Sequence, residues 1–163
     1  MAYNNQPFQN QPSEFIEQVI QINRVSKKTK GGNKINFSAL MVVGDGKGRV
    51  GVGHGKAADV AAAIKKGVTV AKKHMISIPL QKGTIPFHII TKLGGAKVML
   101  KPAPAGSGII AGGAVRSVVS AAGVQNISSK VLGSANKASN VYATIEALTQ
   151  INTLFLKKQK GKK

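Results

Sequence analysis

The side chains that could carry acid–base or metal chemistry are scarce in this chain. Its 163 residues include five acidic residues and three histidines, namely Glu14, Glu17, Asp45, Asp59, Glu146, His54, His74 and His88. The histidines lack the spacing of a metal site, and so few acids leave no arguable Ser-His-Asp arrangement. The absence of cysteine excludes a thiol nucleophile and thiolate metal ligands. We therefore predict that the protein is not an enzyme and binds no metal or cofactor.

Two glycine-rich segments resemble nucleotide-binding motifs, but neither has the required context. Gly46-Lys-Gly48-Arg-Val-Gly51 fits G-x-G-x-x-G, which binds a dinucleotide where a strand turns directly into a helix. Here the segment spans the turn of a predicted hairpin, in which Asp45 is expected to stabilise the turn. Gly53-His-Gly-Lys56 is similar to the end of a P-loop, but Ala57 stands where Ser or Thr is needed. No small-molecule substrate is predicted.

The glycine-rich segments at residues 53–56 and 106–113 each precede a predicted helix. Both could bind phosphate through exposed backbone amides. In residues 53–56 the side chains of His54 and Lys56 would assist. Residues 106–113 could hold either phosphate or the backbone of a partner protein, and Arg116 could bind a phosphate or a partner carboxylate. In both segments the alternative is that glycine only lets a helix pack closely on a strand.

The charge balance identifies the class of partner. Lys and Arg number 24 against five acids, a net charge of +19, which favours a polyanion such as nucleic acid. A hydrophobic content of 42% argues against a disordered chain. Aromatic residues make up only 4%, so contacts to phosphate and sugar fit better than base stacking. The strongest local basic cluster is Arg24, Lys27, Lys28, Lys30 and Lys34.

The polar N-terminus does not resemble a secretory signal. No apolar run approaches the roughly 18–20 residues of a membrane span, so no membrane partner is expected.

The first half of the chain reads as three strands and a helix. A polar tail, 1–13, precedes a domain predicted for residues 14–78. Its expected elements are a strand at 16–26, a basic loop at 27–34, a strand at 35–43, a turn at 44–48, a return strand at 49–53 and an amphipathic helix at 56–74.

The second half reads as a ββαβα unit. A linker at 79–85 leads to a domain predicted for 86–153, in which helices cover one face of a sheet. Its expected elements are strands at 87–91 and 96–101, a helix after Gly113, a strand at 124–131 and a helix at 140–148. Residues 154–163 are expected to form a basic tail. The fold class is therefore α+β.

Several segments together resemble a known family. They are Asn23-Arg-Val-Ser-Lys27 with Lys30-Gly-Gly32, Val42-Val-Gly-Asp-Gly46 with Gly48-Arg-Val-Gly51, Gly55-Lys-Ala57, and Gly106-Ser-Gly-Ile-Ile-Ala-Gly-Gly113. Over residues 14–150 the chain resembles the family of bacterial-type small-subunit ribosomal protein number five. The resemblance implies an N-terminal domain like a double-stranded-RNA-binding fold and a C-terminal ββαβα domain.

The resemblance also implies a function. Members bind small-subunit ribosomal RNA, help to hold the head of the subunit relative to its body, contact ribosomal proteins four and eight, and support decoding accuracy. Cytoplasmic localisation in the small ribosomal subunit is implied. The alternative is a free double-stranded-RNA-binding regulator outside the ribosome.

The residues expected to contact RNA are Arg24, Ser26, Lys27, Lys28, Lys30, Lys47, Arg49, His54 and Lys56. The family's projecting hairpin, near its spectinomycin site, matches the loop at Arg24 to Lys27. Gly108 and Arg116 match positions that the family places at the contact with ribosomal protein four. Gly106 is predicted to belong to the same contact. One departure stands out: the family usually has Asn-Pro-Ile-Asn before the last helix, whereas here Asn136 is followed by Lys137, which leaves that loop without its rigid proline.

Overall fold

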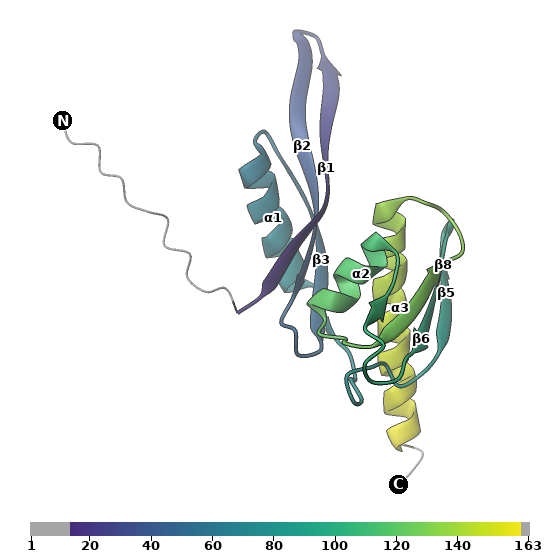
Figure 1. Cartoon of the computed structure of the whole chain (residues 1–163). Helices are drawn as coiled ribbons and strands as arrows, with labels where there is room; N and C mark the ends of the chain where they lie inside the picture. The colour runs from purple at the N-terminus through teal and green to yellow at the C-terminus, as the bar shows by residue number, and fades with distance from the viewer. Residues whose placement is uncertain (1–13, 161–163) are drawn as a thin grey trace, which may run out of the picture.

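The computed structural model describes residues 14–160, so the predicted tail at 1–13 and residues 161–163 lie outside it. The described chain forms two four-stranded sheets and three helices (Figure 1). The long hairpin of β1 (Ile16–Thr29) and β2 (Gly32–Gly44) rises from the body of the molecule, and helix α2 (Gly113–Ala121) lies between the two sheets. The predicted α+β class is confirmed.

The N-terminal sheet is antiparallel, with strand order β1-β2-β3-β4. It comprises β1 (Ile16–Thr29), β2 (Gly32–Gly44), β3 (Arg49–Ala57) and the short β4 (Met75–Ser77). Helix α1 (Val60–Lys73) covers one face. The three predicted strands and the helix are present, and β4 adds a fourth strand that the sequence reading missed.

The predicted basic loop at 27–34 is wrong. Strands β1 and β2 remain paired as far as Thr29 and Gly32, so that only Lys30 and Gly31 form the turn. Apolar alternation stops after Val25, which hid this part of the strands. The ladder of backbone hydrogen bonds nevertheless continues, because pairing does not require a buried face.

The predicted start of the first helix at Lys56 is also wrong. Strand β3 continues to Ala57, and α1 begins at Val60, where the Asp59 side chain accepts a hydrogen bond from the N–H of Ala61. The glycines of β3 lie directly beneath the helix: a Cβ on Gly53 would overlap the carbonyl oxygen of Gly67. Close packing of helix on strand, the alternative considered from the sequence, is what these glycines provide.

The C-terminal sheet has strand order β5-β6-β8-β7, with β7 parallel to β8 and the other pairs antiparallel. Its elements are β5 (Ile89–Leu93), β6 (Ala96–Pro102), β7 (Ile109–Ile110), α2 (Gly113–Ala121), β8 (Ile127–Val131) and α3 (Lys137–Lys160). The predicted ββαβα order holds, with β7 as an extra strand. Strand β5 lies two residues later than expected, and β8 begins three residues later.

Helix α3 is much longer than the predicted 140–148. It spans 24 residues and includes the described part of the predicted basic tail, 154–160. Ile151 is fully buried, so apolar contacts continue beyond Leu148 and carry the helix onward.

One hydrophobic core joins the two halves of the chain. Leu40 and Val52 of the first sheet belong to the same buried cluster as Val118 of α2 and Leu148 of α3. Ile85, inside the predicted linker, belongs to it too and is only 1% exposed. A smaller cluster lies under α1, formed by Met41, Val43, Val68 and Ala71. The base of the hairpin is therefore packed against the C-terminal half.

The turn between β2 and β3 completes the end of α2. The N–H groups of Gly46 and Gly48 donate to the carbonyl oxygens of Ala121 and Ala122, at 3.1 and 2.9 Å. The last carbonyls of a helix have no partner within the helix, so these two bonds satisfy groups that would otherwise be buried unpaired. Gly123 adjoins this contact with a φ of +83°.

Candidate nucleic-acid interface

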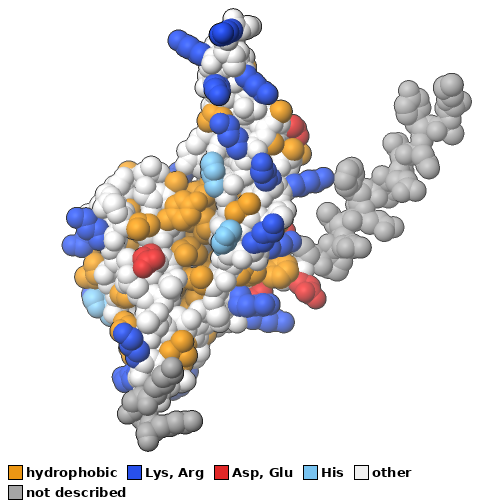
Figure 2. All heavy atoms as spheres, turned by 180° about the vertical axis from the view of Figure 1, so that it is seen from behind, with side chains coloured by type: hydrophobic (Ala, Val, Ile, Leu, Met, Phe, Trp, Pro, Cys, Tyr) orange, Lys and Arg blue, Asp and Glu red, His pale blue; other side chains and the backbone are white. Residues whose placement is uncertain are grey.

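The hairpin of β1 and β2 presents basic side chains on both of its faces. Because side chains alternate along a strand, Arg24, Ser26 and Lys28 share one face, the face that carries α1 lower in the sheet. Lys27 and its cross-strand partner Lys34 lie on the other face. All five are exposed, and Figure 2 shows Lys and Arg side chains around the tip of the hairpin. The predicted cluster is thus a two-sided basic projection, with Lys30 in its turn.

His54 and Lys56 do not lie at a helix N-terminus, as the sequence suggested. Both are exposed residues of β3, on the face opposite α1. The His54 Nε2 atom forms a hydrogen bond with the Ser38 hydroxyl of the neighbouring strand, and Lys56 lies directly across from Ser38 in the ladder. Their face is the one that carries Lys27 and Lys34, so these four residues can contact the same ligand.

Lys47 and Arg49 lie at the opposite end of the sheet from the hairpin turn. Strand β2 has 13 residues, which corresponds to roughly 40 Å. Lys47 is exposed in the turn that docks on α2, and Arg49 begins β3. The predicted RNA-binding residues therefore form two regions rather than one site.

Arg49 is already paired within the protein. Its Nε atom donates to the Asp45 Oδ2 atom at 2.8 Å, while Asp45 Oδ1 accepts from the backbone N–H groups of Lys47 and Arg49. Burial of the Asp45 carboxylate opposes ionisation, but these hydrogen bonds outweigh it and lower the pKa of Asp45 to about 2. The predicted role of Asp45 in the turn is confirmed, and Arg49 is a weaker candidate for phosphate.

The second glycine-rich segment lies before and at the start of α2. Gly106 and Gly108 have φ values of +89° and +68°, which favour glycine. The Gly108 N–H donates to the Asn126 side chain at 3.1 Å, so this loop is held against the start of β8. Arg116 is exposed on α2 and takes part in no ion pair within residues 14–160. Its guanidinium is available to either RNA or a protein carboxylate.

Most acidic side chains are engaged inside the protein. Glu17 pairs with Lys72 at 3.1 Å, Asp45 with Arg49, Asp59 caps α1, and Glu146 accepts from Gln150. Arg49 and Lys72 are the two cations that form ion pairs among the described side chains. The other described basic side chains thus lack a carboxylate counter-charge and can bind an external polyanion.

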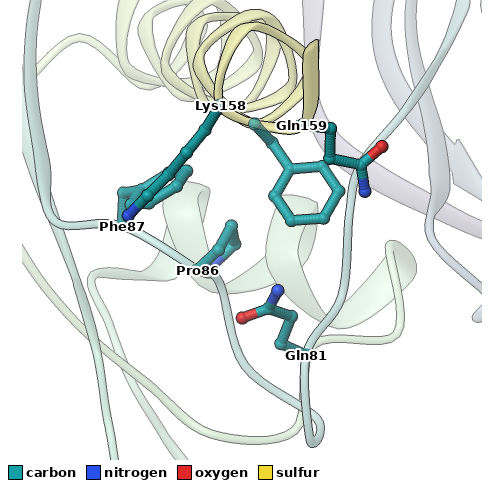
Figure 3. Close-up of a pocket in the computed structure, with 6 residues that line it drawn as sticks. Gln81, Pro86, Phe87, Lys158 and Gln159 are labelled. Atoms are coloured by element: carbon teal, nitrogen blue, oxygen red, sulfur yellow. The ribbon is translucent and has the colours of Figure 1, made fainter. Parts of the chain in front are cut away.

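A hollow of about 370 Å³ lies beside the end of α3, lined by Gln81, Pro86, Phe87, Phe155, Lys158 and Gln159 (Figure 3). Lys158 extends over the Phe87 ring, with Nζ 5.2 Å from the ring centroid. The lining contains no carboxylate or imidazole, so it offers no acid–base pair.

Two further observations bear on partners. Within the described range, no three His, Cys, Asp or Glu side chains come together as metal ligands. Of the helices in residues 14–160, none combines the length and apolar character that crossing a membrane requires.

The docking of the β2–β3 turn on α2 is the feature that sequence reasoning missed. The glycines at both sides of this contact were visible in the sequence, but only as turn residues. No local pattern indicates that a turn and a helix end, far apart along the chain, satisfy each other's hydrogen bonds.

Comparisons with known proteins agree with the fold. Residues 15–79 match the family "Ribosomal protein S5, N-terminal domain", and residues 91–159 match "Ribosomal protein S5, C-terminal domain". Over 141 residues the chain is 52% identical to a Chloroflexus aurantiacus protein named "Small ribosomal subunit protein uS5", covering 86% of this chain and 79% of that protein. The chain therefore belongs to the ribosomal protein S5 family.

Proposed function

We propose that the protein is a structural, non-enzymatic constituent of the small ribosomal subunit that binds its ribosomal RNA through the β1–β2 hairpin. The supporting observation is the two-sided basic projection, whose base packs into the shared core. Arg24 and Lys28 face one way and Lys27 and Lys34 the other. Such a projection can neutralise phosphates of two RNA segments at once.

The proposal extends to the subunit's mechanics. A hairpin with RNA on both faces can link two parts of the subunit, as the family resemblance implies for the head and the body. The exposed Arg116, with the loop at Gly106 and Gly108, would contact ribosomal protein four and support decoding accuracy. Ribosomal protein eight is the second expected neighbour.

Binding of a small-subunit ribosomal RNA transcript at several salt concentrations tests the RNA contact. The double variant Arg24→Glu with Lys28→Glu should bind at least about tenfold more weakly, and log K should depend less steeply on log salt. A control, Lys157→Glu with Lys158→Glu, makes the same charge change at the far end of α3 and should lose less affinity. Wild-type affinity in the folded hairpin variant would contradict the proposal.

Sedimentation of cell extract tests the assembly. Co-migration of the protein with small subunits supports the proposal, whereas recovery in a light fraction indicates a free RNA-binding regulator. For the protein contact, Arg116→Glu should weaken binding to ribosomal protein four while binding of the RNA transcript is nearly unchanged. Loss of RNA binding instead would assign Arg116 to phosphate.

A further inference from the structure

The C-terminal sheet has one covered face and one open face. The covered face carries Val98, Leu100 and Thr91, all buried, and the Thr91 hydroxyl donates to Gln150 of α3 at 3.0 Å. Because side chains alternate along each strand, their neighbours point away from the helices. In Figure 1 both α2 and α3 lie on the side of this sheet that faces the N-terminal half.

Four lysines gather on the open face, and we name Lys92, Lys97, Lys101 and Lys130 the lysine face. Lys92 lies directly across from Lys97, and Lys130 across from Met99. Lys97 and Lys101 flank Met99 along β6. Three lysines therefore surround one half-buried methionine, whose apolar surface their aliphatic stems can cover.

The lysine face has no internal counter-charge. Strands β5, β6, β7 and β8 contain no acidic residue, and none of the four lysines forms an ion pair within the part of the chain that the structure describes. Like charges directly opposite each other across a ladder are unfavourable, which is the arrangement of Lys92 and Lys97. A bound anion would remove this repulsion.

We propose that the lysine face is a second RNA-binding surface, which takes the phosphodiester backbone of ribosomal RNA. This inference rests on the proposed function and adds a site in the C-terminal half. Lys97 and Lys101 are four residues apart on one strand, about 13 Å, so the face spans more than one phosphate. Binding is independent of sequence, because the face offers ammonium groups and no aromatic ring for bases.

An RNA backbone fits this surface better than an acidic protein does. Lysine is depleted in protein–protein interfaces, and their binding energy depends on Trp, Tyr and Arg. The outward positions carry none of these three; besides the lysines they present Ile90, Met99, Ile110 and Ser128. Ile90 and Ile110 are 48% and 60% exposed, and they can pack against ribose.

The test is titration of a full-length small-subunit ribosomal RNA transcript with the whole chain over a range of salt. In the test variant Lys97, Lys101 and Lys130 are each replaced by Gln, which keeps a stem over Met99. The matched control replaces Lys65, Lys66 and Lys73, exposed on α1, by Gln. We expect the test variant to bind the RNA at least about tenfold more weakly. The slope of log K against log salt should become shallower by about 2–3, since each phosphate contact contributes roughly 0.7–0.9 to that slope.

The outcomes separate this proposal from the hairpin. If the hairpin variant loses affinity and the sheet variant behaves like its control, the lysine face is not an RNA site while the proposed function stands. If neither variant loses affinity, both proposals fail. If the sheet variant retains RNA binding but loses binding to polyglutamate, the face is a surface for acidic proteins and the proposal is overturned.

A second measurement uses the unaltered protein and so does not depend on the folding of a variant. Acetylation of lysines in the wild-type chain, with and without the RNA transcript, should show protection of Lys97, Lys101 and Lys130. Lys65 and Lys66 should show less protection. Equal reactivity of the sheet lysines in both states would overturn the proposal.

Discussion

The N–H of Gly48 donates a hydrogen bond to the carbonyl oxygen of Ala122, 2.9 Å away, and so joins the β2–β3 turn to the end of α2. The neighbouring Gly46 makes the equivalent bond to Ala121. Backbone meets backbone at this junction, which leaves no room for a side chain. Because the two backbones are this close, even the methyl group of an alanine should disturb the junction.

Gly123→Ala should destabilise the protein by roughly 3 kcal/mol. Its φ of +83° is unfavourable for alanine, and a Cβ there would overlap the carbonyl oxygen of Gly46, a cost typical of overpacking. Urea denaturation measures the loss. Gly113→Ala is the control, because a Cβ at Gly113 meets no atom within 4 Å; equal stability of the two variants would contradict the junction.

Gly53→Ala should also cost roughly 3 kcal/mol, for a different reason. Here the backbone conformation is ordinary, but the new methyl group would push α1 away from β3, and packed interiors tolerate such overlap poorly. The matched change is Gly31→Ala in the hairpin turn, where nothing lies within 4 Å and stability should change by less than about 0.5 kcal/mol. Thermal unfolding followed by circular dichroism compares them, and a stable Gly53→Ala protein would disprove the close approach.

Asp45 should contribute to stability in a pH-dependent way. Its pKa is about 2 in the folded protein, below the ordinary value of 3.8 for an aspartate, so its contribution is complete above about pH 4 and is lost as the pH falls through 2. We expect about 1 kcal/mol, because the Arg49 side chain that pairs with it is 58% exposed and solvent screens the pair.

Denaturation of the wild type and of Asp45→Asn between pH 2 and pH 6 measures this contribution. The difference in unfolding free energy should be largest at pH 6 and should shrink towards pH 2. A difference that stays constant over this range would show that the charge of Asp45 is not responsible.

Lys137→Pro should be tolerated and should stabilise α3 slightly, by about 0.5 kcal/mol. Lys137 is the first residue of the helix, where proline is favoured because its missing N–H would have no partner in the helix. The contrasting variant is Ala138→Pro, which removes the N–H that donates to the Asn136 side chain at 3.0 Å. Calorimetry should rank Lys137→Pro at or above wild type and Ala138→Pro below it; the reverse order would mean that α3 starts elsewhere.

The sequence predicted elements well where buried and exposed side chains alternate regularly. In β6 the buried Ala96, Val98 and Leu100 alternate with exposed Lys97 and Lys101, and the strand was predicted to within one residue. The same alternation places Lys97 and Lys101 on one face of the strand.

Prediction failed where glycine replaced the side chains that make a pattern. The glycines of β3 leave no apolar signal on the face under α1, so the apolar spacing after Lys56 predicts a helix where the strand still continues. Asp59, the residue that caps α1, was the sequence signal that could have corrected the start. The paired ends of β1 and β2 are not predicted for a related reason. Exposed lysines on both faces give no alternation of apolar and polar side chains.

The contacts that position the candidate site depend on tertiary structure and could not be derived from local patterns. The charge balance predicts a basic cluster in this part of the chain, but the division of its side chains between two faces follows from the pairing of Lys27 with Lys34. Lys47 and Arg49 are also expected to contact RNA, but the length of β2 separates them from the hairpin turn.

The shared core determines how the two halves of the protein respond to unfolding and to mechanical force. The two family matches divide the chain in sequence, yet the end of α2 and the apolar residues of β2 and β3 complete each other across that division. Neither half retains a finished interior when cut away from the other. The two halves are therefore expected to unfold together as one cooperative unit, so that a pull on either half loads the interior of both.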